Sequence, residues 1–244
     1  MALPELLLID KPKGISSFAV IRELRRRTGV KKFGHAGTLD PLATGLMLVG
    51  AGRGTKRLTA LVGLDKEYIA TICVGEERST GDMEGVVVKE RAYQGDLTDI
   101  AVKLALQEMT TALTLPVSAY SAIKRDGVPM YKRARQAAAR GEQIAVADRP
   151  VRVMVVHDAE LQGFFPTANR LFLTVRFCVS SGTYIRSLAE ELGRRLGYPA
   201  TLASLRRTKI GSYSIKEASQ LDDFGSGFRR GFRRRLSHLF HQFA

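Results

Sequence analysis

The residues with the clearest catalytic potential lie in the segment GHAGTLDPLATG at residues 34–45. An isolated Asp-Pro pair is typical of an ordinary turn, because the aspartate bonds its own backbone and the proline fixes φ. Here Asp40 stands in a glycine-punctuated loop directly before an apolar run at residues 46–49. Loops of this kind hold catalytic groups on a rigid scaffold and let a substrate backbone approach closely. Asp40 is therefore the candidate catalytic carboxylate.

A histidine in the same loop, His35, could in principle act as a general base or as a metal ligand. A zinc site needs several His, Cys or carboxylate ligands at short spacing. No second ligand stands at such a spacing from His35, and the other histidines, His157, His238 and His241, are distant in the sequence. A metal site is therefore not expected.

The overall charge favours a polyanionic partner. The 244 residues carry 38 Lys and Arg against 24 Asp and Glu, which gives a formal net charge of +14. Each contact between such a side chain and a phosphate releases counterions, so the excess favours nucleic acid. Binding to a membrane surface is the competing explanation. Nucleic acid is favoured because the rest of the chain reads as a globular enzyme.

Composition and the N-terminal sequence lead us to expect a cytoplasmic protein. Apolar residues make up 45% of it, enough for a sizeable core. Its two cysteines, Cys73 and Cys178, stand in apolar, strand-like runs and are interpreted as reduced thiols rather than a disulfide. The N-terminus MALPELLLID lacks the features of a signal peptide, and no segment is long and apolar enough to span a membrane.

The elements that must position the Asp40 loop alternate between strands and helices. A helix capped by Ser16 or Ser17 is predicted to place Phe18, Ile21 and Leu24 on one face. Because the elements interleave without regular βαβ spacing, we predict an α/β (α+β) fold, a mixed, mostly antiparallel sheet with flanking helices. The other predicted strands are 6–9, 46–49, 67–74, 151–156 and 171–179, and the other predicted helices are 54–61, 100–113, 129–139 and 184–196.

The end of the chain changes character. Residues 224–244 carry five arginines and no acidic residue. Phe and Leu side chains recur there every three or four positions, as on an amphipathic helix, but three glycines weaken that prediction. A frayed or weakly docked tail and a basic helix that contacts RNA or the protein itself both remain open.

Several segments, in matching order, resemble the TruB family of bacterial tRNA pseudouridine-55 synthases. The strongest is GHAGTLDPLATGLMLVG, which resembles the family's catalytic motif. The resemblance covers roughly residues 5–215 and implies a pseudouridine-synthase fold that isomerises uridine 55 in the T-loop of tRNA. The other matching segments are DKPKGISS from residue 10, with Ile-Ser in place of the commoner threonine-containing form, KEY from residue 66, SAYSAIK from residue 118, SGTYIRSL from residue 181 and LRRT from residue 205.

The resemblance implies three catalytic residues. Asp40 would be the nucleophile, since a carboxylate can attack covalently and divide one hard step into two easier ones. It could add to the uracil ring or assist chemistry at the ribose, and both routes remain open. Arg186 would pair with Asp40 and keep its carboxylate ionised and oriented. Tyr68 would stack on the target uracil, and its phenol could take part in proton transfer at C5.

The resemblance also implies residues that bind the substrate. His35 would stack in the RNA, in the space left by flipped nucleotides. Tyr184 and Leu205 would line the uracil pocket, and Lys11 and Pro12 would support the active-site loop. Extrusion of the uridine costs a few kcal/mol, which phosphate contacts could supply. The candidates for those contacts, chosen by charge alone, are Lys31, Lys32, Arg53, Lys56, Lys124, Lys132 and Arg133.

The predicted organisation is a catalytic domain over residues 1–215 and a short basic tail over 216–244. The tail is too short for the C-terminal RNA-binding PUA domain of many family members. No cofactor is expected, since an isomerisation transfers no electrons. The expected partner is the T-arm of tRNA, with a monomeric enzyme and no obligatory protein partner.

Two alternatives compete with the stand-alone enzyme. An RNA-guided, dyskerin-like synthase carries a similar motif, but the PLATG sequence after Asp40 and the short N-terminus favour the stand-alone form. A non-catalytic tRNA-binding or tRNA-folding protein would be expected to lack Asp40, Tyr68 or Arg186, and this chain has all three.

Overall fold

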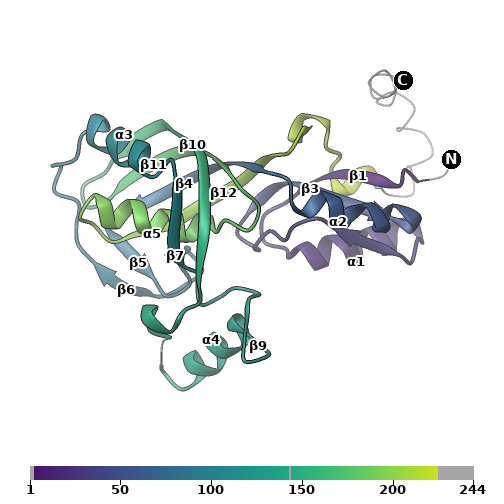
Figure 1. Ribbon diagram of the computed structural model, residues 1–244, viewed down its shortest axis with the longest axis horizontal. Coiled ribbons are helices and arrows are strands. Elements are labelled where there is room, and N and C mark those ends of the chain that lie inside the picture. The colour runs from purple at the N-terminus through teal and green to yellow at the C-terminus, as the bar shows by residue number, and fades with distance from the viewer. Residues whose placement is uncertain (1–2, 143, 225–244) are drawn as a thin grey trace. The chain divides into compact units, whose positions relative to one another are not determined.

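The computed structural model describes residues 3–142 and 144–224, which fall into two compact units (Figure 1). Unit 1 comprises Met1–Leu64 with Arg207–Ala244, and unit 2 comprises Asp65–Arg206. Both units combine helices with largely antiparallel strands, so the predicted fold class is confirmed. The sequence predicts a boundary after residue 215, between a catalytic domain and a tail, which is not the boundary between these two units. That boundary stays a prediction.

Unit 1 is built on two antiparallel strands, β1 (Leu6–Lys11) and β3 (Thr44–Ala51). The short strand β2 (Phe33–His35) also pairs with β3, and β12 (Ala200–Ile210) is the next strand beside β3. The hairpin partner of β12 is β13 (Tyr213–Ser214). The loop with Asp40 therefore connects two paired strands of the sheet, β2 and β3, and both of its ends are fixed by that sheet.

Helix α1 (Ser17–Thr28) starts where the sequence predicts, with Ser16 as its N-cap. Its buried residues are Ser17, Val20, Ile21 and Leu24, whereas the ring of Phe18 is 58% exposed. The prediction that Phe18 shares the apolar face was wrong. Successive residues turn by about 100° around a helix, so once Ser17 faces inward Phe18 is carried off the buried stripe.

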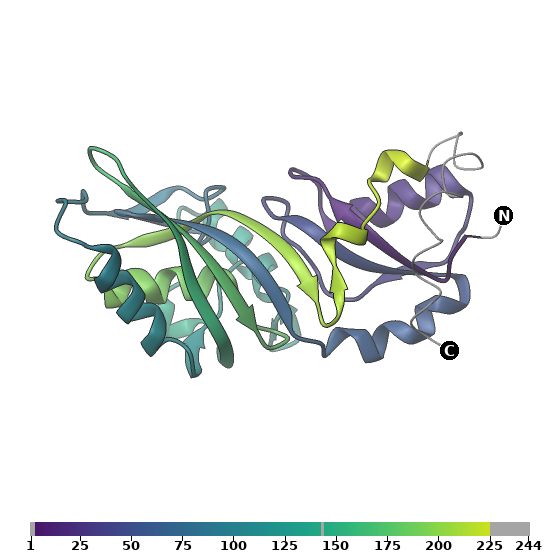
Figure 2. The ribbon, with the colours of Figure 1, turned by 90° about the horizontal axis from the view of Figure 1, so that it is seen from above.

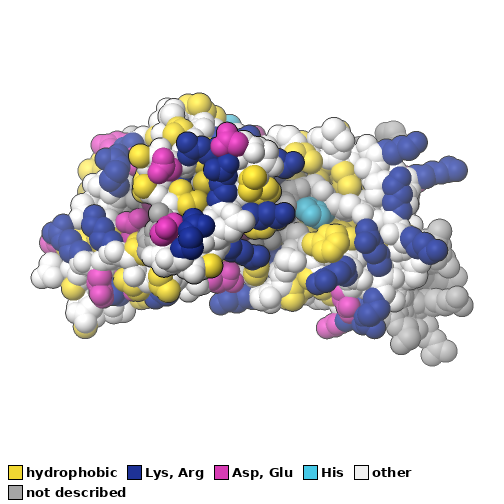
Figure 3. Space-filling view, turned by 90° about the horizontal axis from the view of Figure 1, so that it is seen from below, with side chains coloured by type: hydrophobic (Ala, Val, Ile, Leu, Met, Phe, Trp, Pro, Cys, Tyr) yellow, Lys and Arg dark blue, Asp and Glu magenta, His cyan; other side chains and the backbone are white. Residues whose placement is uncertain are grey.

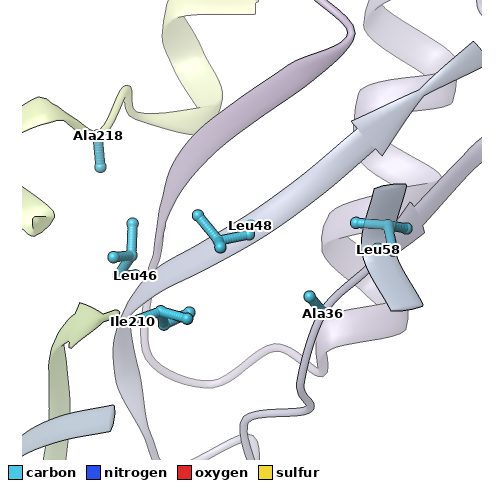
Figure 4. Packing of buried hydrophobic residues seen from close by; sticks show 6 residues of the cluster. All are labelled: Ala36, Leu46, Leu48, Leu58, Ile210 and Ala218. Carbon is cyan, nitrogen blue, oxygen red and sulfur yellow. The ribbon is translucent and has the colours of Figure 1, made fainter. Parts of the chain in front are cut away.

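The core of unit 1 joins segments that lie far apart in the sequence. Ala36, Leu46, Leu48, Leu58, Ile210 and Ala218 form one buried cluster (Figure 4). Backbone hydrogen bonds also attach Ser219 to β1, from Ser219 N to Leu8 O and from Asp10 N to Ser219 O, both at 2.9 Å.

Most of the predicted basic tail, residues 225–244, lies outside the described residues. The remaining elements of this unit are η1 (Gly52–Arg57), α2 (Leu58–Val62), η3 (Ile215–Glu217) and η4 (Leu221–Phe224), so the helix predicted over 54–61 is a 3₁₀ turn followed by a short α-helix.

Unit 2 contains a sheet in the order β12-β4-β11-β10-β7. Strands β4 (Lys66–Val74) and β11 (Leu171–Val179) confirm the predictions at 67–74 and 171–179. Strand β10 (Val151–Pro166) runs ten residues past its predicted end, because it continues to pair with β11 as far as Pro166↔Leu171. Figure 2 shows this pair as two long green strands. The edge strand is β7 (Ala112–Pro116).

Three helices accompany this sheet (Figure 1). Helix α3 (Asp99–Glu108) ends earlier than predicted, because the β-forming residues that follow pair with β10 as strand β7. Helix α4 (Met130–Ala139) belongs to an insertion between β7 and β10, and α5 (Ile185–Arg195) lies within the helix predicted over 184–196. No described helix is long and apolar enough to cross a membrane. The short elements are β5 (Glu76–Arg78), β6 (Val87–Glu90), β8 (Lys124–Arg125), β9 (Val128–Pro129) and η2 (Val146–Asp148).

Candidate active site

In unit 1, Asp40 is the first residue of a tight turn between β2 and β3. The Ala43 amide donates to the Asp40 carbonyl at 3.1 Å, and Pro41 takes the second position, where its fixed φ suits the turn. The preceding residue, Leu39, is buried, and its amide donates to Ser17 Oγ at 2.8 Å while Ser17 Oγ donates to its carbonyl at 3.0 Å. The half-buried carboxylate of Asp40 therefore rests on a backbone that is fixed to helix α1.

Lys11 supports the same turn from the end of β1. It is fully buried, and its Nζ donates to the carbonyl of Ile15 at 2.7 Å and to that of Pro41 at 3.4 Å. Such bonds make burial of an ammonium group tolerable. Pro12, the next residue, is exposed, and its carbonyl accepts another bond from Lys11 at 2.9 Å. Both residues lie where support of the loop was predicted, and any contact with substrate stays a prediction.

Arg207 fastens the other side of the loop, and it was not among the predicted site residues. Its side chain is almost fully buried, with Nε donating to the Leu46 carbonyl at 2.7 Å and Nη2 to the Gly37 carbonyl at 3.1 Å. Its backbone packs against Gly45, where an added Cβ would lie 2.3 Å from the Arg207 carbonyl oxygen. The LRRT motif names this arginine, but nothing in that motif separates a buried arginine from its neighbour Arg206.

His35 lies at the end of β2, half-buried beside Arg207. Burial lowers the pKa of the His35 imidazole, and the positive charge of Arg207 lowers it further, while the backbone of Gly37 acts in the opposite direction. Its buried Nδ1 has no hydrogen-bond partner among the described residues. A neutral ring is the form expected near pH 7, and a neutral ring is suited to stacking.

In unit 2, two loops hold Arg186 in the first turn of α5. The residue is 5% exposed, and its Nη1 donates to the Thr80 carbonyl at 2.8 Å and to Ser118 Oγ at 3.0 Å. Its Nη2 donates to the Tyr120 carbonyl at 3.1 Å. Ser118 Oγ also donates to the Thr80 carbonyl at 3.0 Å, which ties the two loops together. A guanidinium group held by several bonds has a fixed plane and a fixed direction.

A buried carboxylate, Asp82, lies beside this guanidinium. Arg186 Nη1 and Asp82 Oδ2 are 3.6 Å apart, and their side chains are only 6% and 4% exposed. Asp82 Oδ1 accepts hydrogen bonds from Thr80 Oγ1 at 2.6 Å and from the Glu84 amide at 3.1 Å. Sequence reasoning missed Asp82, Thr80 and Ser118. The signal for Asp82 was the run STGDMEG at residues 79–85, a second aspartate in a glycine-punctuated turn.

The other predicted residues of unit 2 lie on three different elements. Tyr68 is buried in β4, opposite Phe177 of β11. Tyr184 is the half-buried N-cap residue of α5, Leu205 is half-buried in β12 and Lys124 is exposed in β8. The segment before α5 is tied to β4, because the Nζ of buried Lys66 donates to Ser181 Oγ at 3.0 Å.

Unit 1 therefore gathers Lys11, His35 and Asp40, whereas Tyr68, Tyr184 and Arg186 belong to unit 2. The predicted pairing of Asp40 with Arg186 joins residues of different units and stays a prediction. Across residues 3–142 and 144–224, no three His, Cys, Asp or Glu side chains gather as metal ligands would.

Comparison with known proteins gives this arrangement a family context. The family model for the N-terminal domain of TruB family pseudouridylate synthases matches residues 25–185. The tRNA pseudouridine synthase B of Leifsonia xyli subsp. xyli is 43% identical over 220 residues, which cover 88% of this chain and 70% of that protein. The enzyme of the same name from Desulfotalea psychrophila is 40% identical over 218 residues, which cover 87% of this chain and 84% of that protein.

Solved structures with a similar fold are also known. A chain of the crystal structure of a Cbf5-Nop10-Gar1 complex aligns with a TM-score of 0.64 and 24% identity, covering 89% of this chain and 52% of that one. The archaeal box H/ACA sRNP Nop10-Cbf5 complex gives a TM-score of 0.60 at 24% identity, with 90% and 52% covered. This chain spans about half the length of those two, and at such identity the likeness concerns the fold alone.

Proposed function

The chain belongs to the TruB family of pseudouridylate synthases, and we propose that it isomerises uridine 55 in the T-loop of tRNA with Asp40 as the nucleophile. The family and the relatives named tRNA pseudouridine synthase B make the chain an isomerase that acts on tRNA. The position of the target uridine and the roles of single residues are the proposal.

The observation that best supports the role of Asp40 is that hydrogen bonds from distant residues fix the backbone of its turn. Ser17 bonds both backbone groups of the preceding residue, Lys11 and Gly14 bond the Pro41 carbonyl, and Arg207 holds the loop at Gly37 and Leu46. A catalytic group acts efficiently when its backbone is fixed before the substrate arrives.

The reaction proposed for Asp40 is the isomerisation of uridine to pseudouridine, in which no atom is lost. The N1–C1′ bond of the target uridine breaks and a C5–C1′ bond forms, while C5 loses a proton and N1 gains one. The carboxylate acts as a covalent nucleophile, at the uracil ring or at the ribose, and leaves when the new bond is complete. The phenol of Tyr68 is the proposed group for proton transfer at C5.

Arg186 is the proposed partner of the Asp40 carboxylate. Its fork is already held by the carbonyls of Thr80 and Tyr120 and by Ser118, so little conformational entropy is lost when it acts. A guanidinium held in this way favours the ionised carboxylate, which is the nucleophilic form. Asp82 would set the direction of the guanidinium rather than take part in the reaction itself.

The surface suits a folded RNA. Figure 3 shows a face on which Lys and Arg side chains are widespread among fewer acidic ones. Lys31, Lys32, Arg53 and Lys56 are exposed in unit 1 and stay available for phosphates. Arg133 is a weaker candidate, because its Nη2 already binds the Asp126 carboxylate at 2.8 Å. We include in the proposal that the enzyme acts as a monomer in the cytoplasm, with catalysis confined to residues 1–215.

The test is a pseudouridine map of an unmodified tRNA transcript after incubation with the purified chain. We expect one modified position, uridine 55, without added guide RNA or partner protein. A transcript with cytidine at position 55 is the matched control and should gain no pseudouridine. Modification at a different position would contradict the proposed target, and a requirement for guide RNA would favour the dyskerin-like alternative.

A further inference from the structure

An aromatic ring and an arginine form an exposed pair on the first two turns of α1. Phe18 is 58% exposed, although aromatic side chains on a helix usually turn inward. The guanidinium carbon of Arg22, one turn further on, lies 5.7 Å from the centre of the Phe18 ring. This is cation–π distance, and it holds the guanidinium near the ring while leaving both groups exposed.

This pair stands on the part of α1 that anchors the catalytic loop. Ser17, directly before Phe18, turns inward and bonds both backbone groups of Leu39, the residue before Asp40. The Gly14 amide, just ahead of the helix, donates to the Pro41 carbonyl at 2.8 Å. Phe18 is therefore the sequence neighbour of the residue that bonds the turn of Asp40, within a single compact unit.

The charge around the pair is suited to a nucleic acid strand. The first turn of α1 has no acidic residue. The acid beside Arg22 in sequence, Glu23, is engaged by Arg26 and Arg27, and hydrogen bonds from these two arginines lower its pKa to about 2. Its charge is thus neutralised by its own helix, and it offers little repulsion to an approaching phosphate.

We propose that Phe18 and Arg22 form a stacking platform for an unpaired base of the tRNA loop next to the extruded uridine. The inference rests on the proposed function, because it assumes that tRNA presents a flipped nucleotide to Asp40. Extrusion removes a stacking partner from the neighbouring base, and an exposed ring with a guanidinium can replace that partner. Every base has a π-face, so such a platform adds affinity without requiring a particular base.

The main test measures steady-state kinetics on tRNA for Phe18→Ala, Phe18→Tyr and a control variant, Phe165→Ala. Phe165 lies on β10 of unit 2 and is 59% exposed, so its loss matches that of Phe18 in residue type and exposure. Phe18→Ala should raise KM about 5- to 20-fold, the loss expected for one stacked base. Phe18→Tyr keeps the ring and should stay close to wild type, as should Phe165→Ala.

A spectroscopic readout tests the stacking itself. A tRNA with 2-aminopurine beside the target uridine should lose fluorescence on binding to the Asp40→Asn variant, and less so when Phe18→Ala is added. Because Phe18 is exposed, the thermal unfolding temperature of Phe18→Ala should match that of wild type.

The outcomes separate the two proposals. If wild type modifies uridine 55 but Phe18→Ala has an unchanged KM, or a KM no higher than that of Phe165→Ala, the platform is refuted and the function stands. If wild type makes no pseudouridine, the proposed function fails first. If Phe18→Ala leaves KM unchanged but abolishes binding of the chain to another protein, the pair is a protein contact. That result would also overturn the inference.

Discussion

The guanidinium of Arg207 donates a hydrogen bond to the carbonyl oxygen of Gly37 at 3.1 Å, across 170 residues of sequence. Through Nε the same side chain reaches the Leu46 carbonyl at 2.7 Å. One buried cation thus closes the loop of Asp40 at both ends. The position of the carboxylate therefore depends on a strand that the chain completes long after the loop.

The close approach of Gly45 to Arg207 can be tested by adding one methyl group. In Gly45→Ala the new Cβ would meet the Arg207 carbonyl oxygen at 2.3 Å, at a φ of +108° that favours glycine. We expect a loss of about 3 kcal/mol or more in the free energy of unfolding, measured with urea. The control is Gly29→Ala, where φ is +72° but nothing lies within 4 Å, and which should cost only about 1 kcal/mol. Equal losses would show that backbone strain, and not the contact with Arg207, decides the result.

Substitution of Asp40, the proposed nucleophile, separates chemistry from binding. Asp40→Asn keeps the size of the side chain but removes the carboxylate that is proposed to attack, so pseudouridine formation should fall below detection. Affinity for tRNA, measured by filter binding, should stay within about threefold of wild type, because phosphate contacts supply most of it. Residual turnover near the wild-type rate would remove Asp40 from the mechanism.

The pair of Arg186 and Asp82 predicts a graded series of variants. Arg186→Lys loses the fork that binds the carbonyls of Thr80 and Tyr120, so kcat should fall at least about 100-fold. Asp82→Asn should lower kcat less, about 10- to 100-fold, since it affects only the direction of the guanidinium. In both variants KM for tRNA should change little. A larger effect of Asp82→Asn on KM than on kcat would contradict a positioning role.

The environment of His35 predicts a dependence of stability on pH. Burial and the charge of Arg207 lower the pKa of its imidazole in the folded protein, so the unfolded chain binds the proton first as pH falls. The contribution of His35 to the free energy of unfolding is therefore complete above the imidazole pKa of the unfolded chain, 6.5. It is lost as pH falls from there through the lower pKa of the folded protein. Urea midpoints between pH 7.5 and about pH 5 should decline less steeply for His35→Gln than for wild type. The variant His157→Gln controls for removal of a histidine elsewhere, and an unchanged slope in His35→Gln would disprove the assignment.

Deletion of residues 225–244 tests the basic tail predicted from the sequence. The segment holds five arginines, and each phosphate contact that it makes should add to the salt dependence of binding. The truncated chain should bind tRNA more weakly, with a shallower slope of log affinity against log salt. Unchanged affinity and slope would show that the tail does not contact RNA.

Much of the local structure was predictable, because it depends on neighbours in sequence. The strand-like runs at 67–74 and 171–179, the second of them rich in β-branched residues, predicted β4 and β11, and the serine before α1 predicted where that helix starts. Errors arose where tertiary partners compete with local preference. The helix over 100–113 gave way to β7 because β10 offers a pairing edge, and Phe18 was misplaced because Ser17 turns inward to bond Leu39.

The sequence by itself determined the family, and the run from Gly34 to Gly45 predicted a carboxylate in a glycine-punctuated loop as the reacting group. Only the tertiary structure decided what holds that loop and what holds Arg186. Arg207, Asp82 and Ser118 look like ordinary polar residues in the sequence, and their roles come from burial beside groups up to 170 positions away. A motif records which atoms react, whereas burial and hydrogen bonding between distant segments decide where those atoms are fixed.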